Sequence, residues 1–142
     1  MEEVQEYHRL RWNLNVSLRD SGLEPRSFDL INSRCIAEGI LHNRWTSYVE
    51  ELRKLLKPGG YLQMVEIQYQ FQSNAGRSIP HLTMWNEEYK NVLNSDAQPD
   101  YRRNPRAGRS LEVWLRRAGF EGVQCRNLEL PVGGWKAGER IV

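Results

Sequence analysis

The sequence predicts an α/β protein with a mostly parallel sheet around one hydrophobic core. Two short apolar runs, residues 28–32 and 61–67, are bounded by polar and turn residues, as interior strands of a parallel sheet are. Between them, apolar residues recur at helical spacing. Parallel strands joined by a helix need a crossover connection, so we expect the helix on one face of the sheet.

Length and composition agree with a single globular domain. The chain has 142 residues, of which 39% are hydrophobic and 27% are charged, and one domain usually holds roughly 100 to 200 residues. This composition excludes a disordered chain and a disulfide scaffold. The two cysteines, Cys35 and Cys125, are too few and too distant in sequence for a zinc ribbon or a CxxC redox motif.

Charge and hydropathy limit the expected partners. The net charge is only +2, and the arginine-rich stretch 102–109 carries no aromatic RNA-binding motif, so we expect no nucleic-acid partner. No apolar run approaches the roughly 20 residues that cross a bilayer. The first residues are acidic, whereas a secretory signal begins with basic residues and continues with apolar ones. We therefore expect a cytoplasmic protein with no membrane partner.

The N-terminal half carries signals for each of its elements. Apolar residues follow helical spacing in 1–12 and alternate with polar residues in 13–18, which predicts a helix and then a half-buried strand. Thr46 suits the N-cap of the central helix, and Pro58-Gly59-Gly60 ends that helix before the second apolar run.

The C-terminal half is predicted to contain two helices and a β-hairpin. One helical pattern covers about 82–93, and a last helix runs from Ser110 to Gly119. Strands over 123–128 and 130–132 are expected to form the hairpin. The predicted organisation is a single domain, 1–142, with an N-terminal helix (1–12), a sheet core (13–67), a cap and loop (68–109) and a last helix with its hairpin (110–135).

Several of these segments resemble a known family. The strand Phe28-Asp29-Leu30-Ile31-Asn32-Ser33-Arg34, the turn Leu56-Lys57-Pro58-Gly59-Gly60 and Glu66 resemble the central region of class I S-adenosylmethionine-dependent methyltransferases. They are most similar to the methyltransferase-like proteins of fungal secondary metabolism. The ending Leu115-Arg116-Arg117-Ala118-Gly119-Phe120 resembles the last helix of that family. Over roughly 13–135, the resemblance implies the C-terminal two-thirds of a Rossmann-like methyltransferase fold, with a C-terminal β-hairpin.

The chain departs from the family at the cofactor site. In the family, a glycine-rich loop and an acidic residue on the first two strands hold S-adenosylmethionine, whereas no GxGxG segment occurs in this sequence. The resemblance therefore implies a truncated protein that lacks the N-terminal cofactor-binding motif, with Asp20 left at the adenine position. We expect no cofactor; S-adenosylmethionine binding is the alternative.

Four residues are candidates for catalysis. His42 and Arg34 follow the first buried strand near the sheet edge where open α/β proteins bind ligands, and histidine transfers protons readily near neutrality. Glu66 ends the second buried strand, where burial would raise its pKa. His81 shares a helix face with aromatic residues of the cap. The alternatives are a structural role for each histidine and an ion pair between Glu66 and a nearby arginine.

Aromatic residues of the cap predict a substrate pocket. Trp85 and Tyr89 lie four residues apart on one helix face, the preceding loop contributes Tyr69, and Trp45 follows the His42 loop. A core role is the alternative for these rings. The three histidines are scattered, and no spacing fits a metal site.

The resemblance leads to three functional hypotheses. The first is a methyltransferase-like enzyme that no longer methylates and catalyses a cyclisation, isomerisation or dehydration of a natural-product intermediate. The others are a fragment of an S-adenosylmethionine-dependent methyltransferase and a non-catalytic partner module of a hetero-complex. Because the family's first strand would cover the strand at 28–32, we also expect a homodimer or a companion protein that completes the sheet.

Overall fold

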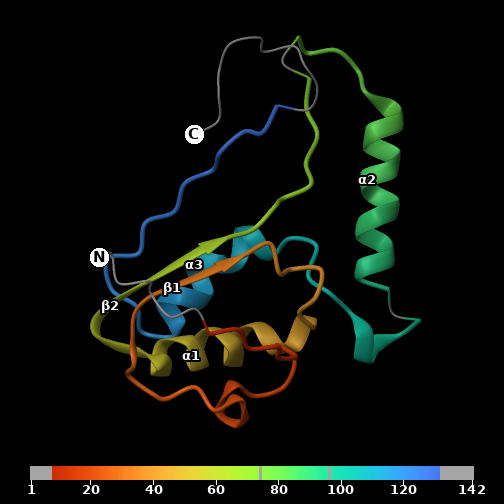
Figure 1. The fold of residues 1–142 in the computed structure, drawn as a ribbon. Helices are drawn as coiled ribbons and strands as arrows, with labels where there is room; N and C mark the ends of the chain where they lie inside the picture. Colours follow the sequence, from red (N-terminus) through yellow and green to blue (C-terminus); the bar gives the residue numbers. More distant parts are fainter. Residues whose placement is uncertain (1–7, 74, 96, 132–142) are drawn as a thin grey trace, which may run out of the picture.

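The computed structural model describes residues 8–73, 75–95 and 97–131 (Figure 1). Within them lie two strands, three α-helices and three short 3-10 helices. The elements in chain order are η1 (Leu18–Ser21), β1 (Phe28–Arg34), η2 (His42–Arg44), α1 (Trp45–Leu55), β2 (Leu56–Val65), α2 (Pro80–Leu93), η3 (Pro99–Tyr101) and α3 (Ala107–Arg117).

The predicted strand, helix and strand are confirmed. β1 and β2 form a parallel two-stranded sheet in which Leu30 pairs with Tyr61 and Ile31 with Leu62. β2 begins at Leu56, before the predicted run, and the register is irregular where the Pro-Gly-Gly turn passes β1. A side chain at Gly60 would lie 3.1 Å from the Asp29 carbonyl oxygen, so this close approach of the backbones favours glycine.

The hydrophobic core lies between one face of the sheet and helices α1 and α3. α1 buries Trp45, Tyr48, Val49, Leu52 and Leu55, which recur at helical spacing. From the sheet, Ile31, Leu62 and Met64 pack against this cluster. Burial of this apolar surface is the main favourable term in the folding of this part of the chain.

The opposite face of the sheet is open in the described residues. Leu30 is 59% exposed, and its neighbour across the ladder, Tyr61, is 76% exposed. Because side chains alternate along a strand, these residues point away from the core that Ile31 contacts. The sheet therefore has one packed face and one bare face.

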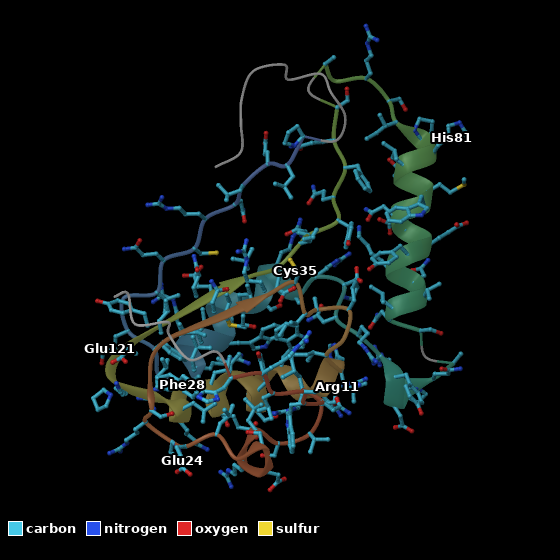
Figure 2. All side chains as sticks on the ribbon, in the orientation of Figure 1. Arg11, Glu24, Phe28, Cys35, His81 and Glu121 are labelled. Carbon is cyan, nitrogen blue, oxygen red and sulfur yellow. The ribbon has the colours of Figure 1, made fainter. Side chains whose placement is uncertain are left out.

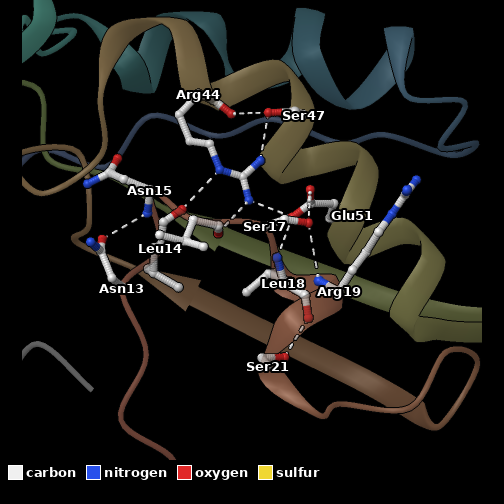
Figure 3. A network of polar contacts seen from close by, with 11 residues as sticks. Asn13, Leu14, Asn15, Ser17, Leu18, Arg19, Ser21, Arg44, Ser47 and Glu51 are labelled. Carbon is white, nitrogen blue, oxygen red and sulfur yellow. Dashed lines mark hydrogen bonds and ion pairs between the residues drawn. The ribbon is translucent and has the colours of Figure 1, made fainter.

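The strand predicted over 13–18 is wrong. Val16 N–H donates to the Asn13 carbonyl at 3.0 Å, and the chain then enters η1. The Arg44 guanidinium donates hydrogen bonds to the carbonyl oxygens of Leu14 and Val16, and the Glu51 carboxylate accepts one from the Leu18 N–H (Figure 3). Side chains of η2 and α1 thus satisfy this backbone, and alternation alone did not reveal them.

Two other predicted elements are not found in the described residues. The chain has no helix over 8–12, and residues 1–7 of that prediction lie outside the described part. The predicted C-terminal β-hairpin is not supported: residues 123–131 contain no strand, and Val132 lies outside the described part. Leu128 and Leu130 are 83% and 59% exposed, so neither side chain joins the hydrophobic core.

Candidate functional site

Glu66 joins the carboxyl ends of the two strands. It directly follows β2, and its two carboxylate oxygens accept hydrogen bonds from the backbone N–H groups of Ile36 and Ala37, both at 3.1 Å. Burial raises the pKa of Glu66, although the two N–H groups act in the opposite direction. The carboxylate therefore anchors the loop after β1.

The other three catalytic candidates lie in separate places. His42 opens η2 and is exposed, while its backbone N–H donates to the Arg102 carbonyl at 2.8 Å. His81 occupies the first turn of α2, at the end of the helix away from the sheet (Figure 2). Arg34 is the exposed last residue of β1. The structure does not bring these side chains together with Glu66.

Trp45 and Asp20 also lie apart from a common site. Trp45 is 1% exposed in the core and stacks on Trp114, with ring centroids 4.8 Å apart and planes at 10°. Asp20 is an exposed residue of η1, the short helix whose Leu18 N–H is held by Glu51 of α1.

The remaining substrate candidates, Tyr69, Trp85 and Tyr89, join Phe71 in an aromatic cluster, which we define by these four residues. Trp85 stacks on Tyr89 with centroids 5.2 Å apart and planes at 8°. Tyr69 meets both rings edge to face, and Phe71 meets Trp85 in the same way. Such arrangements suit the quadrupoles of aromatic rings. The cluster attaches α2 to the segment that follows β2.

Glu38 is the polar centre beside this cluster. Its Oε1 accepts hydrogen bonds from the hydroxyls of Tyr69, at 3.0 Å, and Tyr89. Burial and the neighbouring carboxylate raise the pKa of both tyrosines. The Glu38 carbonyl in turn accepts from Arg103 Nε at 3.0 Å. The sequence analysis missed Glu38, although its position four residues after a buried strand could have indicated it.

A hollow of about 290 Å³, which we call the α2 hollow, lies beside the aromatic cluster. It is bordered by one face of α2, the segment after β2 and the first turn of α3. The lining residues are Gln68, Tyr69, Gln70, Phe71, Thr83, Asn86, Glu87, Lys90, Pro105, Arg106 and Arg109.

A second hollow, of about 340 Å³, lies at the carboxyl end of β1. Its lining residues are Trp12, Asn13, Leu14, Asn15, Cys35, Ile36, Gly39 and Ile40. The Asn15 side chain is already engaged, since it donates to the Gly39 carbonyl and accepts from the Leu41 N–H, both at 2.8 Å. None of the lining residues is charged.

Two absences apply to the described residues. None of their helices has the length and apolar character to cross a membrane. In the same part of the chain, no three His, Cys, Asp or Glu side chains gather into a group that could hold a metal ion.

The chain is similar to fungal proteins of secondary metabolism. It is 30% identical over 122 residues to the secondary metabolism regulator LAE1 of Pyricularia oryzae. The match covers 85% of this chain and 36% of LAE1. It is 31% identical over 107 residues to N-methyltransferase sirN of Leptosphaeria maculans. That match covers 75% of this chain and 36% of sirN. It is 28% identical over 114 residues to N-methyltransferase gliN of Aspergillus fumigatus. That match covers 75% of this chain and 37% of gliN.

These homologues confirm the family resemblance: the chain is similar to the methyltransferase-like proteins of fungal secondary metabolism. The chain spans little more than a third of the length of the curated relatives it matches. No family model matches the chain, and no solved structure matches it either. The parallel arrangement of β1, α1 and β2 is compatible with the Rossmann-like fold that the homologues suggest.

The described residues around the hollow beside Cys35 do not fit S-adenosylmethionine. The hollow beside Cys35 offers apolar walls but no carboxylate for the ribose and no glycine-rich loop for the amino-acid end. Asp20, the expected adenine contact, is not among its lining residues.

Proposed function

We propose that this chain binds a small-molecule intermediate of fungal secondary metabolism against the aromatic cluster. We further propose that it catalyses a step without methyl transfer, such as an isomerisation, cyclisation or dehydration. The observation that carries this proposal is the Glu38 carboxylate held by two tyrosine hydroxyls. Carboxylates and phenols serve as general acids and bases, and Trp85, 45% exposed, offers a surface for a planar molecule.

The chemistry would centre on Glu38. Its Oε2 has no hydrogen bond to the described residues, whereas Oε1 is held by Tyr69 and Tyr89. Oε2 can accept a proton from a carbon next to a carbonyl. The same proton returns to another carbon in an isomerisation, or to a departing hydroxyl in a dehydration, which releases water. The raised pKa of both tyrosines keeps them protonated at neutral pH, so they continue to orient the carboxylate.

One feature supports a reaction other than methyl transfer by this chain. The described residues that line the hollow beside Cys35 include no charged group that would hold the ribose or the amino-acid end of S-adenosylmethionine. A proton transfer at Glu38 needs no such group.

Methyl transfer is the second candidate. Two of the relatives carry the name N-methyltransferase, and the hollow beside Cys35 lies at the strand end where open α/β sheets bind ligands. In this case the chain supplies the acceptor side, and a further segment or a companion protein supplies the cofactor side. A non-catalytic module of such a complex would present the same surface without turnover.

One incubation separates these functions. The purified chain is mixed with a fungal small-molecule extract, with and without S-adenosylmethionine, and the products are analysed by mass spectrometry. A product of unchanged mass, or one that has lost water, supports the proposal if Glu38→Gln abolishes it and Glu50→Gln, an exposed change on α1, does not. A product heavier by one methylene that requires S-adenosylmethionine contradicts it. No product in either mixture supports the non-catalytic module.

We also propose that two copies of the chain associate through the open face of the sheet. Leu30 and Tyr61 lie next to each other on that face and are largely exposed. Two exposed apolar side chains beside unpaired strand edges favour pairing with another chain. A companion protein on the same face is the alternative.

A further inference from the structure

The α2 hollow contains a buried polar group without a partner. Asn86 is 6% exposed, and its Oδ1 has no hydrogen bond to the described residues. The large majority of buried side-chain polar atoms in folded proteins have a partner. Because Asn86 lines the hollow, a rotation of its amide toward the hollow would let a bound molecule with an N–H or O–H group supply the missing donor.

The hollow also has an excess of positive charge. Lys90 is neutralised by Glu87, at 2.9 Å. Arg109 donates one N–H to Gln70 Oε1 at 2.7 Å, which orients its guanidinium across the hollow without neutralising it. The Arg106 side chain has no hydrogen bond or ion pair to the described residues that line the hollow. Two arginines therefore remain available, and a guanidinium recognises a carboxylate through paired N–H donors.

The walls of the hollow and its size limit the ligand further. Tyr69, Phe71 and Pro105 provide an apolar side. Drug-sized ligands usually occupy pockets of about 300 to 1,000 Å³. At about 290 Å³, the α2 hollow suits a molecule with one aromatic ring and a short polar chain.

We infer that the α2 hollow binds a small aromatic carboxylate with an amine or hydroxyl donor, such as an aromatic amino acid or a close derivative. Its carboxylate contacts Arg106 and Arg109, its donor reaches Asn86 Oδ1, and its ring packs on Phe71. The hollow shares Tyr69 and Phe71 with the aromatic cluster, so this inference rests on the proposed function and names a substrate class for it.

Three related molecules test the inference by titration calorimetry with the full chain. L-phenylalanine carries all three features, phenethylamine lacks the carboxylate, and 3-phenylpropionate lacks the amine. We expect L-phenylalanine to bind at least about tenfold more tightly than either of the others, since each lacks a hydrogen bond that involves a charged group.

Variants assign each preference to its residue. The double change Arg106→Gln and Arg109→Gln should remove the preference for L-phenylalanine over phenethylamine. Asn86→Leu should remove the preference over 3-phenylpropionate, whereas Asn86→Asp keeps an acceptor oxygen and should retain it. Arg117→Gln, an exposed change at the other end of α3, is the matched control and should alter neither. Circular dichroism checks that each variant is folded.

The outcomes separate this inference from the proposed function. Equal binding of the three molecules, unchanged by the arginine variants but lost in Trp85→Ala, would overturn the inference and leave the aromatic binding site standing. Binding of none of them would overturn the inference, whereas the proposed function would still be judged by the product test with Glu38→Gln. If Asn86→Leu fails to fold, the wild-type series and the arginine variants still decide.

Discussion

The two sides of this molecule are held together by different forces. On the α1 side, Trp45, Val49 and Ile40 are almost completely buried, and α3 closes over them. On the α2 side, Asn86 is the one buried residue of the helix within the described part, and Val92 is 75% exposed. α2 is attached through aromatic rings and the tyrosine bonds to Glu38. We therefore expect the α1 side to contribute most of the free energy of unfolding. We expect the α2 side to be less stable and to become more ordered when a ligand binds.

The largest expected effect compares one tryptophan from each side. Trp45→Ala removes a buried ring that stacks on Trp114 and should lower the free energy of unfolding by about 3–5 kcal/mol. Trp85→Ala removes a ring that is 45% exposed and should cost less, about 1–2 kcal/mol. Urea unfolding followed by circular dichroism measures both changes. Equal losses would contradict the division into a packed side and an attached side.

The second prediction concerns the ion pair that joins η2 to α1 (Figure 3). Arg44 and Glu51 are 8% and 13% exposed, so Arg44→Met leaves a largely buried carboxylate without its cation. It should lower the free energy of unfolding by about 3 kcal/mol. Arg116→Met breaks a pair whose members, Arg116 and Glu112, are 58% and 44% exposed, and it should cost about 0.5 kcal/mol or less. An effect of Arg44→Met as small as that of its control would argue against a structural role for this pair.

The third prediction contrasts the pH dependence of two carboxylates. For Glu51, burial acts to raise the pKa, but the Leu18 N–H, Arg44 and Ser17 together bring it below the usual 4.5. Its stabilising contribution is therefore present above pH 4.5 and is lost as the pH falls through the lower folded value. The pKa of Glu66 is raised above 4.5, mainly by burial. Its contribution is present below pH 4.5 and is lost as the pH rises through the higher folded value.

Unfolding at a series of pH values tests this contrast. Glu51→Gln should flatten the loss of stability on the acid side of pH 4.5, and Glu66→Gln should flatten the loss just above it. If both variants change the same limb of the pH profile, the assignment of opposite shifts is wrong.

The smallest expected effect on stability comes from the open face of the sheet. Tyr61→Lys changes a residue that is 76% exposed, so it should alter the free energy of unfolding by about 0.5 kcal/mol or less and yet dissociate a dimer. Ile31→Asp, at a partly buried position on the packed face, should cost more stability than Tyr61→Lys, because its carboxylate would lose water without gaining a partner. Light scattering at several concentrations measures the assembly. A wild-type chain that is monomeric throughout would rule out the proposed dimer.

Local patterns were sufficient for the centre of the fold. β1, α1 and β2 were predictable because apolar spacing, the Pro-Gly-Gly turn and short connections all act within one contiguous segment. The same reasoning failed over 13–18, where alternation predicted a strand. There, the side chains of Arg44 and Glu51 form hydrogen bonds with backbone groups that a neighbouring strand would otherwise have paired. These two residues lie about 30 positions further along the chain.

The sequence by itself determined that a parallel strand–helix–strand unit forms and that Tyr69, Trp85 and Tyr89 are candidates for one aromatic site. Only the tertiary structure decided that Trp45 belongs to the core, that Glu38 joins Tyr69 and Tyr89, and that Asn86 faces the α2 hollow. The physical reason is the range of the interactions. Helix and strand periodicity is local, whereas the partners of the Glu38 carboxylate and the surroundings of the Asn86 amide come from distant segments and depend on how those segments pack.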